Sequence, residues 1–339
     1  MSTPRTLRRR TLALGGLMLP LAGLAACADP VSSATGPGAS DPGGSDGGGG
    51  GASDAGGSQG TAIDTSGTQE LIRASADPEI AALLPEEIAA AGVLRAGTNG
   101  AGTAPLAFLA DDNTTYIGSE IDIARIVADR LGLTLDLRLT TWENWPLKLE
   151  AGEFDVVHAN IGINAERLQK FDFASYRAAY MSFLAAKGAD FFLEDPASVS
   201  GRIIAVGAAT NQERILTDWN ARLQAEGKEP AQLKNYSSDA DTLLALGSGR
   251  IDATMGPYAS QSFVAARRTD VEVQGRIDAG WPDQTLVAAT FPAGSGLAAA
   301  YAAALNSLIA DGTYAAVQER WGLTAESLPE SRVHTQENP

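Results

Sequence analysis

Cysteine, histidine and basic residues are scarce in this 339-residue sequence. The single cysteine, Cys27, excludes an intrachain disulfide. The two histidines, His158 and His334, lie far apart in the sequence, so we expect neither a metal cluster nor a Cys/His nucleophile, and we expect no cofactor. No Gly-Lys-Ser/Thr phosphate loop is present either. The net charge of -16 argues against binding to nucleic acid or to an anionic membrane surface.

The composition of the chain bounds its architecture. Hydrophobic residues make up 44% of the sequence and charged residues 19%. For a chain of this length, we therefore expect two hydrophobic cores of modest size rather than a single one.

The N-terminal segment has the pattern of an export signal. Arg5 to Arg10 form a basic region, an apolar stretch follows, and Leu24-Ala25-Ala26-Cys27 closes it with small residues before the cysteine. This ending resembles a bacterial lipobox, which implies removal of residues 1–26 and lipid attached to Cys27. The alternatives are an ordinary signal peptide with an incidental cysteine, or export through the twin-arginine route suggested by Arg8-Arg9-Arg10.

Residues 27–70 are dominated by Gly, Ser, Asp, Ala and Pro. Such a composition buries too little apolar surface to offset the entropy of ordering. We therefore expect a disordered tether between the anchor and a folded body.

The folded part alternates predicted strands and helices, which is typical of parallel βαβ units. The order helix, Gly, acid, apolar strand at 147–158 recurs at 241–255, so we predict two α/β lobes. Lobe 1 is expected to comprise residues 79–184 and 285–325, lobe 2 residues 188–280, and the remainder, 326–339, a polar tail. Strands at Ser182–Ala186 and Thr285–Thr290 are expected to carry the chain across and back.

Other strands are predicted at 93–99, 133–139, 155–159, 202–206 and 232–236. Helices are predicted at 80–91, 145–151, 212–225, 297–310 and 313–320. A further helix, ending before Gly132, should begin with a capping box at Ser119 and Asp122, and another should be capped at Ser238.

One stretch, residues 153–173, suggests a binding site. Asp155 opens a short apolar run that reads as a buried strand, and Arg167 follows its carboxyl end. Ligands bind at this edge of open α/β sheets, where a guanidinium can hold a carboxylate through two parallel hydrogen bonds. The alternative is a solvated arginine or one in a surface ion pair.

Six motifs occur together in one order along the chain. They are Val93 to Asn99, Gly118-Ser-Glu-Ile-Asp122, Gly152-Glu-Phe-Asp155, Asn164-Ala-Glu-Arg167 with Phe171-Asp-Phe173, Gly249-Arg-Ile-Asp252, and Asp311-Gly-Thr-Tyr314 with Trp321-Gly322. Over residues 91–323 the chain thereby resembles the polar-amino-acid-type extracellular solute-binding proteins of ABC importers. The resemblance implies a two-lobed, type II periplasmic-binding-protein-like α/β fold with two hinge strands.

The resemblance also implies ligand contacts. Arg167 matches the arginine that grips the ligand's α-carboxylate, and Gly162 falls where a Thr or Ser is usual. Asn160 matches a polar contact position, and Asn99 stands where an Asp is common. Thr210 and Asn211 match a pair of ligand contacts in the second lobe; the alternative is that they only cap a helix. Trp142 matches a residue of the pocket wall; the alternative is that it belongs to the core.

Two departures concern the ligand's ammonium group. Pro257 stands where the resemblance places an ammonium-binding acid, and the aromatic residue expected between Asn99 and Pro105 is absent. An unpaired ammonium in a closed cleft would be costly, so another acid, such as Glu120 or Glu143, would have to serve, or the ligand is not an ordinary α-amino acid.

The resemblance implies a non-enzymatic, monomeric, membrane-anchored receptor outside the cytoplasm that delivers an amino acid or related carboxylate to a permease. Two alternatives remain open. One is an enzyme of the same fold, similar to cyclohexadienyl dehydratase, and the other is a ligand-sensing component of a signalling system.

Overall fold

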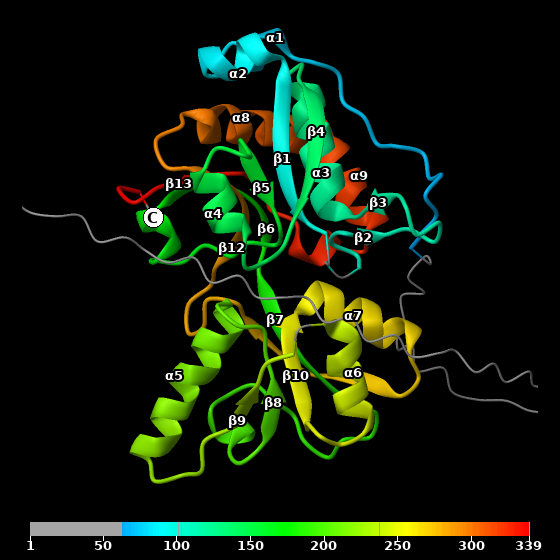
Figure 1. Cartoon of the computed structure of the whole chain (residues 1–339), viewed down its shortest axis with the longest axis vertical. Helices are drawn as coiled ribbons and strands as arrows, with labels where there is room; N and C mark the ends of the chain where they lie inside the picture. The colour runs from blue at the N-terminus through cyan, green and yellow to red at the C-terminus, as the bar shows by residue number, and fades with distance from the viewer. Residues whose placement is uncertain (1–62, 101, 103, 237, 339) are drawn as a thin grey trace, which may run out of the picture. The chain divides into compact units, whose positions relative to one another are not determined.

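The computed structural model describes residues 63–100, 102, 104–236 and 238–338, all within one compact unit, residues 58–339. The predicted signal peptide, Cys27 and most of the predicted tether lie outside these residues. The described residues form two α/β lobes, each built on its own sheet, with β7 leading from one lobe into the other (Figure 1).

The sheet of lobe 1 has the strand order β13-β6-β12-β5-β1-β4. Parallel pairing joins β1 to β4 and β5, whereas β12 runs antiparallel to β5 and β6. The strands are β1 (Val93–Asn99), β4 (Thr134–Thr140), β5 (Val156–His158), β6 (Phe171–Ala178), β12 (Leu286–Pro292) and β13 (Val333–His334).

Three helices of lobe 1, α3 (Ser119–Arg130), α8 (Leu297–Ala310) and α9 (Thr313–Arg320), pack against one another beside this sheet. The helix α4 (Trp145–Glu150) contacts β5 and β12, where Trp145, Phe154 and Phe173 belong to a separate apolar cluster. The helices α1 (Pro78–Ala81) and α2 (Glu86–Ala91) precede β1, and a hairpin of β2 (Phe108–Leu109) and β3 (Tyr116–Ile117) precedes α3. The single helix predicted over 80–91 is therefore two, separated by Pro85.

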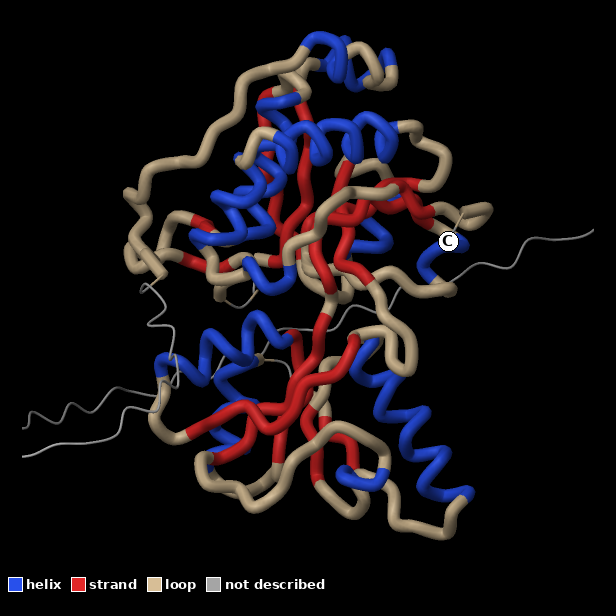
Figure 2. Tube along the Cα trace, turned by 180° about the vertical axis from the view of Figure 1, so that it is seen from behind, coloured by secondary structure: helices blue, strands red, loops and turns tan. Residues whose placement is uncertain are grey.

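The sheet of lobe 2 has the order β11-β7-β10-β8-β9. Its strands are β7 (Tyr180–Ala186), β8 (Ile203–Ala205), β9 (Gln232–Lys234), β10 (Ala253–Pro257) and β11 (Val271–Asp278). Its helices are α5 (Asn211–Ala225), α6 (Asp239–Gly247) and α7 (Tyr258–Arg267). The tube view from behind shows these helices around the lower sheet (Figure 2).

Two adjacent segments connect the lobes. The first is the junction of β6 and β7 at Ala179, and the second runs from β11 to β12. Ala179 joins them, because its N–H donates to the Thr285 carbonyl (3.2 Å) and its carbonyl accepts from the Ala279 N–H (3.0 Å). The predicted boundary after residue 184 is wrong: β7 pairs with β10 and β11, so residues 180–186 belong to lobe 2.

Both ends of the described chain are more ordered than predicted. The predicted tether extended to residue 70, yet Ile63 and Ile72 pack against the main core, and Thr65 donates to Asp111 (3.1 Å). The predicted polar tail contributes Glu326, which is buried, and β13, which pairs with β6. Apolar and charged partners on lobe 1 hold both segments in place.

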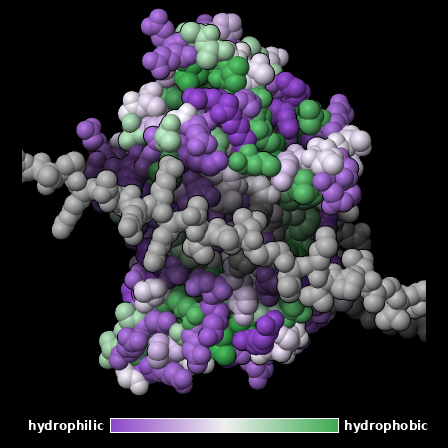
Figure 3. All heavy atoms as spheres, in the orientation of Figure 1, coloured by the Kyte–Doolittle hydropathy of each residue, from purple (hydrophilic) through white to green (hydrophobic). Residues whose placement is uncertain are grey.

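On the face shown in Figure 3, hydrophilic and hydrophobic residues are interspersed over both lobes. Among the described residues, no helix combines the length and apolar character that a membrane crossing requires.

Candidate functional site

A cleft of about 710 Å³ lies between the lobes and is lined by residues from both. All seven predicted contact residues line it: Asn99, Trp142, Asn160, Gly162, Arg167, Thr210 and Asn211. Asn99 ends β1, and the others follow β4, β5 and β8, so the carboxyl ends of parallel strands bring them together.

Among the described residues that line this cleft, Arg167 is the cation. It begins a short 3-10 turn, and its backbone N–H donates to the Asn164 side chain (2.8 Å). Its Nη1 donates to the Gly162 carbonyl (2.7 Å), and its guanidinium lies 5.2 Å from the centre of the Trp142 ring. Backbone and ring together fix the direction of the guanidinium.

The guanidinium of Arg167 has no carboxylate within ion-pair distance in the described part of the chain. Burial lowers the pKa of Arg167 to about 10, against a smaller opposing effect of Glu166. The group therefore remains charged at neutral pH while partly desolvated. A partly desolvated arginine without an internal counterion is suited to an anionic ligand.

Thr210 and Asn211 approach from lobe 2. The Thr210 hydroxyl accepts from Glu213 N–H (3.2 Å) and donates to the Gly207 carbonyl (2.7 Å), so Thr210 is the N-cap of α5. Thr210 therefore caps α5 and also lines the cleft, and its contact with a ligand stays a prediction. Asn211 is buried and accepts from the Asn164 amide of lobe 1 (2.9 Å), which makes it a bridge between the lobes.

Gly162 makes room for that bridge. A Cβ atom placed on Gly162 would lie 2.6 Å from Nδ2 of Asn211. A Thr or Ser at this position would therefore displace the Asn211 amide. The absence of a Thr or Ser hydroxyl at position 162 therefore goes together with the position of the Asn211 amide.

Trp142 is half-buried: it lines the cleft and also packs against the apolar cluster that contains Trp145. Its indole N–H donates to the Ala208 carbonyl of lobe 2 (3.2 Å). Arg167 makes a second contact of this kind, a long hydrogen bond to the Ala209 carbonyl (3.4 Å). Both contacts join the lobes at the loop before α5.

A buried charged cluster underlies Asn160. Arg177 pairs with Glu326 and donates to the Asn160 side-chain oxygen, and its Nη2 lies 3.6 Å from Oε1 of Glu120. The other oxygen of Glu120 accepts from the Asn160 N–H (2.9 Å) and from the Tyr176 hydroxyl. We name Glu120, Asn160, Tyr176, Arg177 and Glu326 the buried charge cluster.

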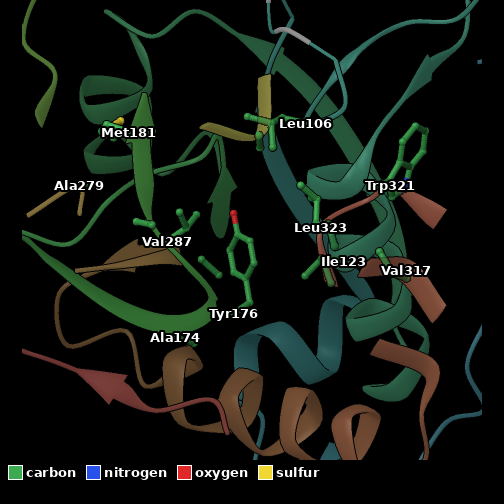
Figure 4. Close-up of a cluster of buried hydrophobic side chains, with 14 of the residues drawn as sticks. Leu106, Ile123, Ala174, Tyr176, Met181, Ala279, Val287, Val317, Trp321 and Leu323 are labelled. Atoms are coloured by element: carbon green, nitrogen blue, oxygen red, sulfur yellow. The ribbon is translucent and has the colours of Figure 1, made fainter. Parts of the chain in front are cut away.

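Figure 4 shows Tyr176 of this cluster among apolar side chains, between Val287 on one side and Leu323 and Ile123 on the other. Burial raises the pKa of Tyr176 well above its ordinary value, so it stays a hydroxyl donor to Glu120. Burial also raises the pKa of Glu326, and Arg177 opposes that rise.

The capping box predicted at Ser119 is wrong. Gly118 is the N-cap of α3 and no side chain caps the helix. Gly118 has φ 134°, and a Cβ there would lie 2.1 Å from the Leu106 carbonyl oxygen, so only glycine fits. This turn directs Glu120 inward to Tyr176. The predicted cap at Ser238 is confirmed, since its hydroxyl accepts from Asp241 N–H (3.1 Å).

Pro257 ends β10 and lines the cleft, where it supplies no acid. Among the described lining residues, the acidic ones are Glu120, Glu143 and Asp239. Glu120 and Glu143, the two acids that the sequence suggested as partners for the ammonium group, therefore both line the cleft. Of the three acidic lining residues, Glu120 alone is buried.

His158 lies in the core of lobe 1. Its Nε2 is bonded to the Tyr301 hydroxyl (2.6 Å), and it does not line the cleft. Burial lowers the pKa of His158 to about 3, so it is neutral. No group of side chains suited to holding a metal ion occurs in the described ranges.

Sequence reasoning missed Arg177 and Glu326. The available signal was an arginine inside a stretch rich in apolar residues, Phe171 to Ala179, which is unusual without a buried partner. Its partner lies 149 positions away, and no local pattern indicates that distance.

A cleft between two α/β lobes, joined by two adjacent crossings, defines a type II periplasmic binding protein. Similar solved structures include a mutant arginine-binding protein from T. maritima, with 21% identity and a TM-score of 0.60, covering 70% of this chain and 98% of that one. Another is AbpA of Streptococcus pneumoniae bound to L-arginine, with 18% identity and a TM-score of 0.61, covering 71% and 99%. At these identities the likeness concerns the fold.

Residues 94–324 match the bacterial extracellular solute-binding proteins, family 3, and the chain belongs to that family. The arginine-binding protein ArgT of Corynebacterium glutamicum is 31% identical over 263 residues, 76% of this chain and 84% of ArgT. The L-cystine-binding protein TcyA of Bacillus subtilis is 26% identical, with 68% and 81% covered. The predicted family and fold are confirmed.

Proposed function

We propose that this protein is the extracytoplasmic receptor of an ABC importer and captures an amino acid or a related small carboxylate in its cleft. The observation that carries the proposal is Arg167, a partly desolvated cation at the carboxyl end of β5 with no carboxylate counterion in the described ranges. The α-carboxylate of an amino acid would complete this ion pair.

Closure of the lobes would complete the enclosure of the ligand. Arg167 and Trp142 of lobe 1 already contact the loop before α5 in lobe 2, and Asn164 contacts Asn211. Groups that meet across the cleft can exclude water from the carboxylate, which strengthens the charged hydrogen bonds.

The relatives support an amino acid as the ligand class. ArgT and TcyA are named for the amino acids that they bind, and this chain covers more than four-fifths of each. Delivery to a permease is proposed on the same basis, because the relatives belong to a family of solute-binding proteins.

Membrane attachment through lipid on Cys27 is a further part of the proposal, supported by Leu24-Ala25-Ala26-Cys27. Expression of the full chain with Cys27→Ser should release the protein from the membrane fraction, while the unchanged chain stays there. Equal release of both proteins would contradict the anchor.

The test of ligand capture is a calorimetric screen of the twenty amino acids against the wild type and Arg167→Ala. At least one amino acid should bind to the wild type, and binding should weaken by about 2–5 kcal/mol in the variant because one partner of a desolvated charge pair is lost. Arg214→Ala, which removes an exposed arginine of α5 paired with Asp218, is the matched control and should bind normally. Equal affinity of wild type and Arg167→Ala would overturn the proposal.

A further inference from the structure

The cleft extends into lobe 2, between the helices α6 and α7. The side chains that line this part of it come from different elements: Leu184 of β7, Leu243 of α6, Thr254 of β10 and Val264 of α7. We name these residues the lobe 2 recess. Because Arg167 lines the same cavity, a ligand held at Arg167 can extend into the recess.

The recess is open because the helices do not cover the centre of the lobe 2 sheet. The strand β10 is the central strand, and its Thr254 pairs with Leu184 of β7 and Ala205 of β8. Side chains of α6 and α7 pack against the cluster that contains Leu184 and Ala205, and so lie on the Thr254 face.

The burial pattern of β10 shows the gap. Ala253 and Met255, which face the opposite side of the sheet, are buried, whereas Thr254 is half-buried. A central position beneath two helices would be buried in a close-packed layer, so the packing of α6 and α7 leaves room over Thr254.

The amide of Gln261, at the edge of the recess, is satisfied within lobe 2. Its oxygen accepts from the Ser182 hydroxyl (2.9 Å), and its amino group donates to the Thr254 carbonyl (3.0 Å). Among the described lining residues of lobe 2, Asp239 is the charged one, and it is exposed. A charged ligand end placed in the recess would lose its hydration without a buried partner, which is costly, whereas an apolar end fits.

The recess lies within reach of the carboxylate site. Nη2 of Arg167 is bonded to the Ala209 carbonyl (3.4 Å), and Ala205 lies beside Thr254 in the sheet. The chain from Ala205 to Ala209 spans at most about 14 Å. An extended tail of roughly eight carbon atoms covers most of such a distance.

We propose that the cleft binds monocarboxylates with an extended apolar tail, the carboxylate meeting Arg167 and the tail filling the lobe 2 recess. Pro257, which follows Thr254 towards the end of β10, supplies no acid to the cleft, so this ligand needs no ammonium group there. The proposal rests on the proposed function of the cleft, since Arg167 holds the carboxylate in both.

Calorimetry of the full chain with acetate, butanoate, hexanoate and octanoate tests the proposal. Each methylene that enters the recess should strengthen binding by roughly threefold to fourfold, because apolar surface is removed from water. Octanoate should therefore bind most tightly of the series. Equal affinity for butanoate and octanoate would overturn the proposal.

Variants of α6 test the recess directly. Leu243→Trp fills the recess and should lower the ratio of octanoate to butanoate affinity by at least about tenfold. Leu244→Trp is the matched control: Leu244 is 64% exposed and does not line the cleft, so the same added bulk there should leave the ratio unchanged.

A second variant keeps the test decisive where Leu243→Trp fails to fold. Val264→Asp places a charge in the recess and should lower the same ratio, because an apolar tail would then desolvate the carboxylate. An unchanged ratio in a correctly folded Leu243→Trp or Val264→Asp protein overturns the assignment of the tail to the recess.

The outcomes separate the two proposals. Binding of amino acids or short carboxylates that depends on Arg167, without a gain along the series, overturns the tail assignment and leaves ligand capture standing. Equal octanoate affinity in the wild type and Arg167→Ala overturns the assignment of the carboxylate to Arg167. Absence of binding by every amino acid and every carboxylate overturns both.

Discussion

Glu326 forms a buried ion pair with Arg177, a residue 149 positions earlier in the chain. Their side chains are 3% and 2% exposed. The pair links the segment after α9 to the strand that leads into lobe 2, so the C-terminal segment supports the cleft wall.

We predict that Glu326→Ala lowers the free energy of unfolding by about 3–5 kcal/mol, because it leaves the Arg177 charge buried with reduced compensation. Urea titration followed by circular dichroism measures the loss. Glu330→Ala is the matched control: Glu330 pairs with Arg332 at the surface, and its loss should cost at most about 1 kcal/mol. Equal losses in the two variants would contradict a structural role for the buried pair.

His158 should make the fold sensitive to acid. Its pKa is about 3 in the folded protein against an ordinary 6.5, so the unfolded chain binds the proton first as pH falls. The stabilisation of the fold by neutral His158 is complete above pH 6.5 and is lost progressively towards pH 3, on the order of 5 kcal/mol in total.

His158→Phe removes this titration. The free energy of unfolding of the variant should therefore fall less than that of the wild type between pH 7 and pH 4. Parallel urea titrations at several pH values measure the difference between the two proteins. Parallel pH curves would show that His158 is not held neutral.

Gly162 and Asn211 should act as a coupled pair. Gly162→Ser is expected to displace the Asn211 amide, break its bond to Asn164 and weaken ligand binding by roughly tenfold. In the Gly162→Ser, Asn211→Ala double variant the added side chain has room, so its effect should shrink. Calorimetry of the four proteins gives a coupling energy above about 0.5 kcal/mol, and additive effects would exclude the coupling.

Pro257→Asp should strengthen the binding of α-amino acids, roughly tenfold, by adding an acid for the ammonium group at the cleft. The backbone of Pro257, φ -57° and ψ 132°, preceding α7, suits an N-cap aspartate. Pro257→Asn is the neutral control. The gain should be absent for carboxylic acids that lack the ammonium group, and a gain shared by those acids or by Pro257→Asn would refute the explanation.

The sequence predicts the elements whose patterns are local. Val93–Asn99 is predicted as a strand and is β1, and the helices at 297–310 and 313–320 are α8 and α9. The gathering of Arg167, Asn160 and Asn211 at one cleft follows from the resemblance to a known fold, and their contact with a ligand stays a prediction.

The remaining features depend on distant residues. The strand β6 is buried along most of its length and contains Arg177, so alternation does not reveal it. The turn at Gly118 replaces the capping box because the Leu106 carbonyl lies against it, a contact that the motif Ser-Glu-Ile-Asp does not contain. The C-terminal segment is likewise held in place by contacts with β6, namely the pairing of β13 and the ion pair between Glu326 and Arg177.

The strand β13 lies at the margin of the lobe 1 sheet, where its pairing covers Phe173 and Ala174 of β6. Without it, β6 would present unpaired N–H and C=O groups to any second polypeptide. The pairing of Val333 and His334 therefore covers part of this edge, and we predict that shortening the chain before Val333 would favour self-association.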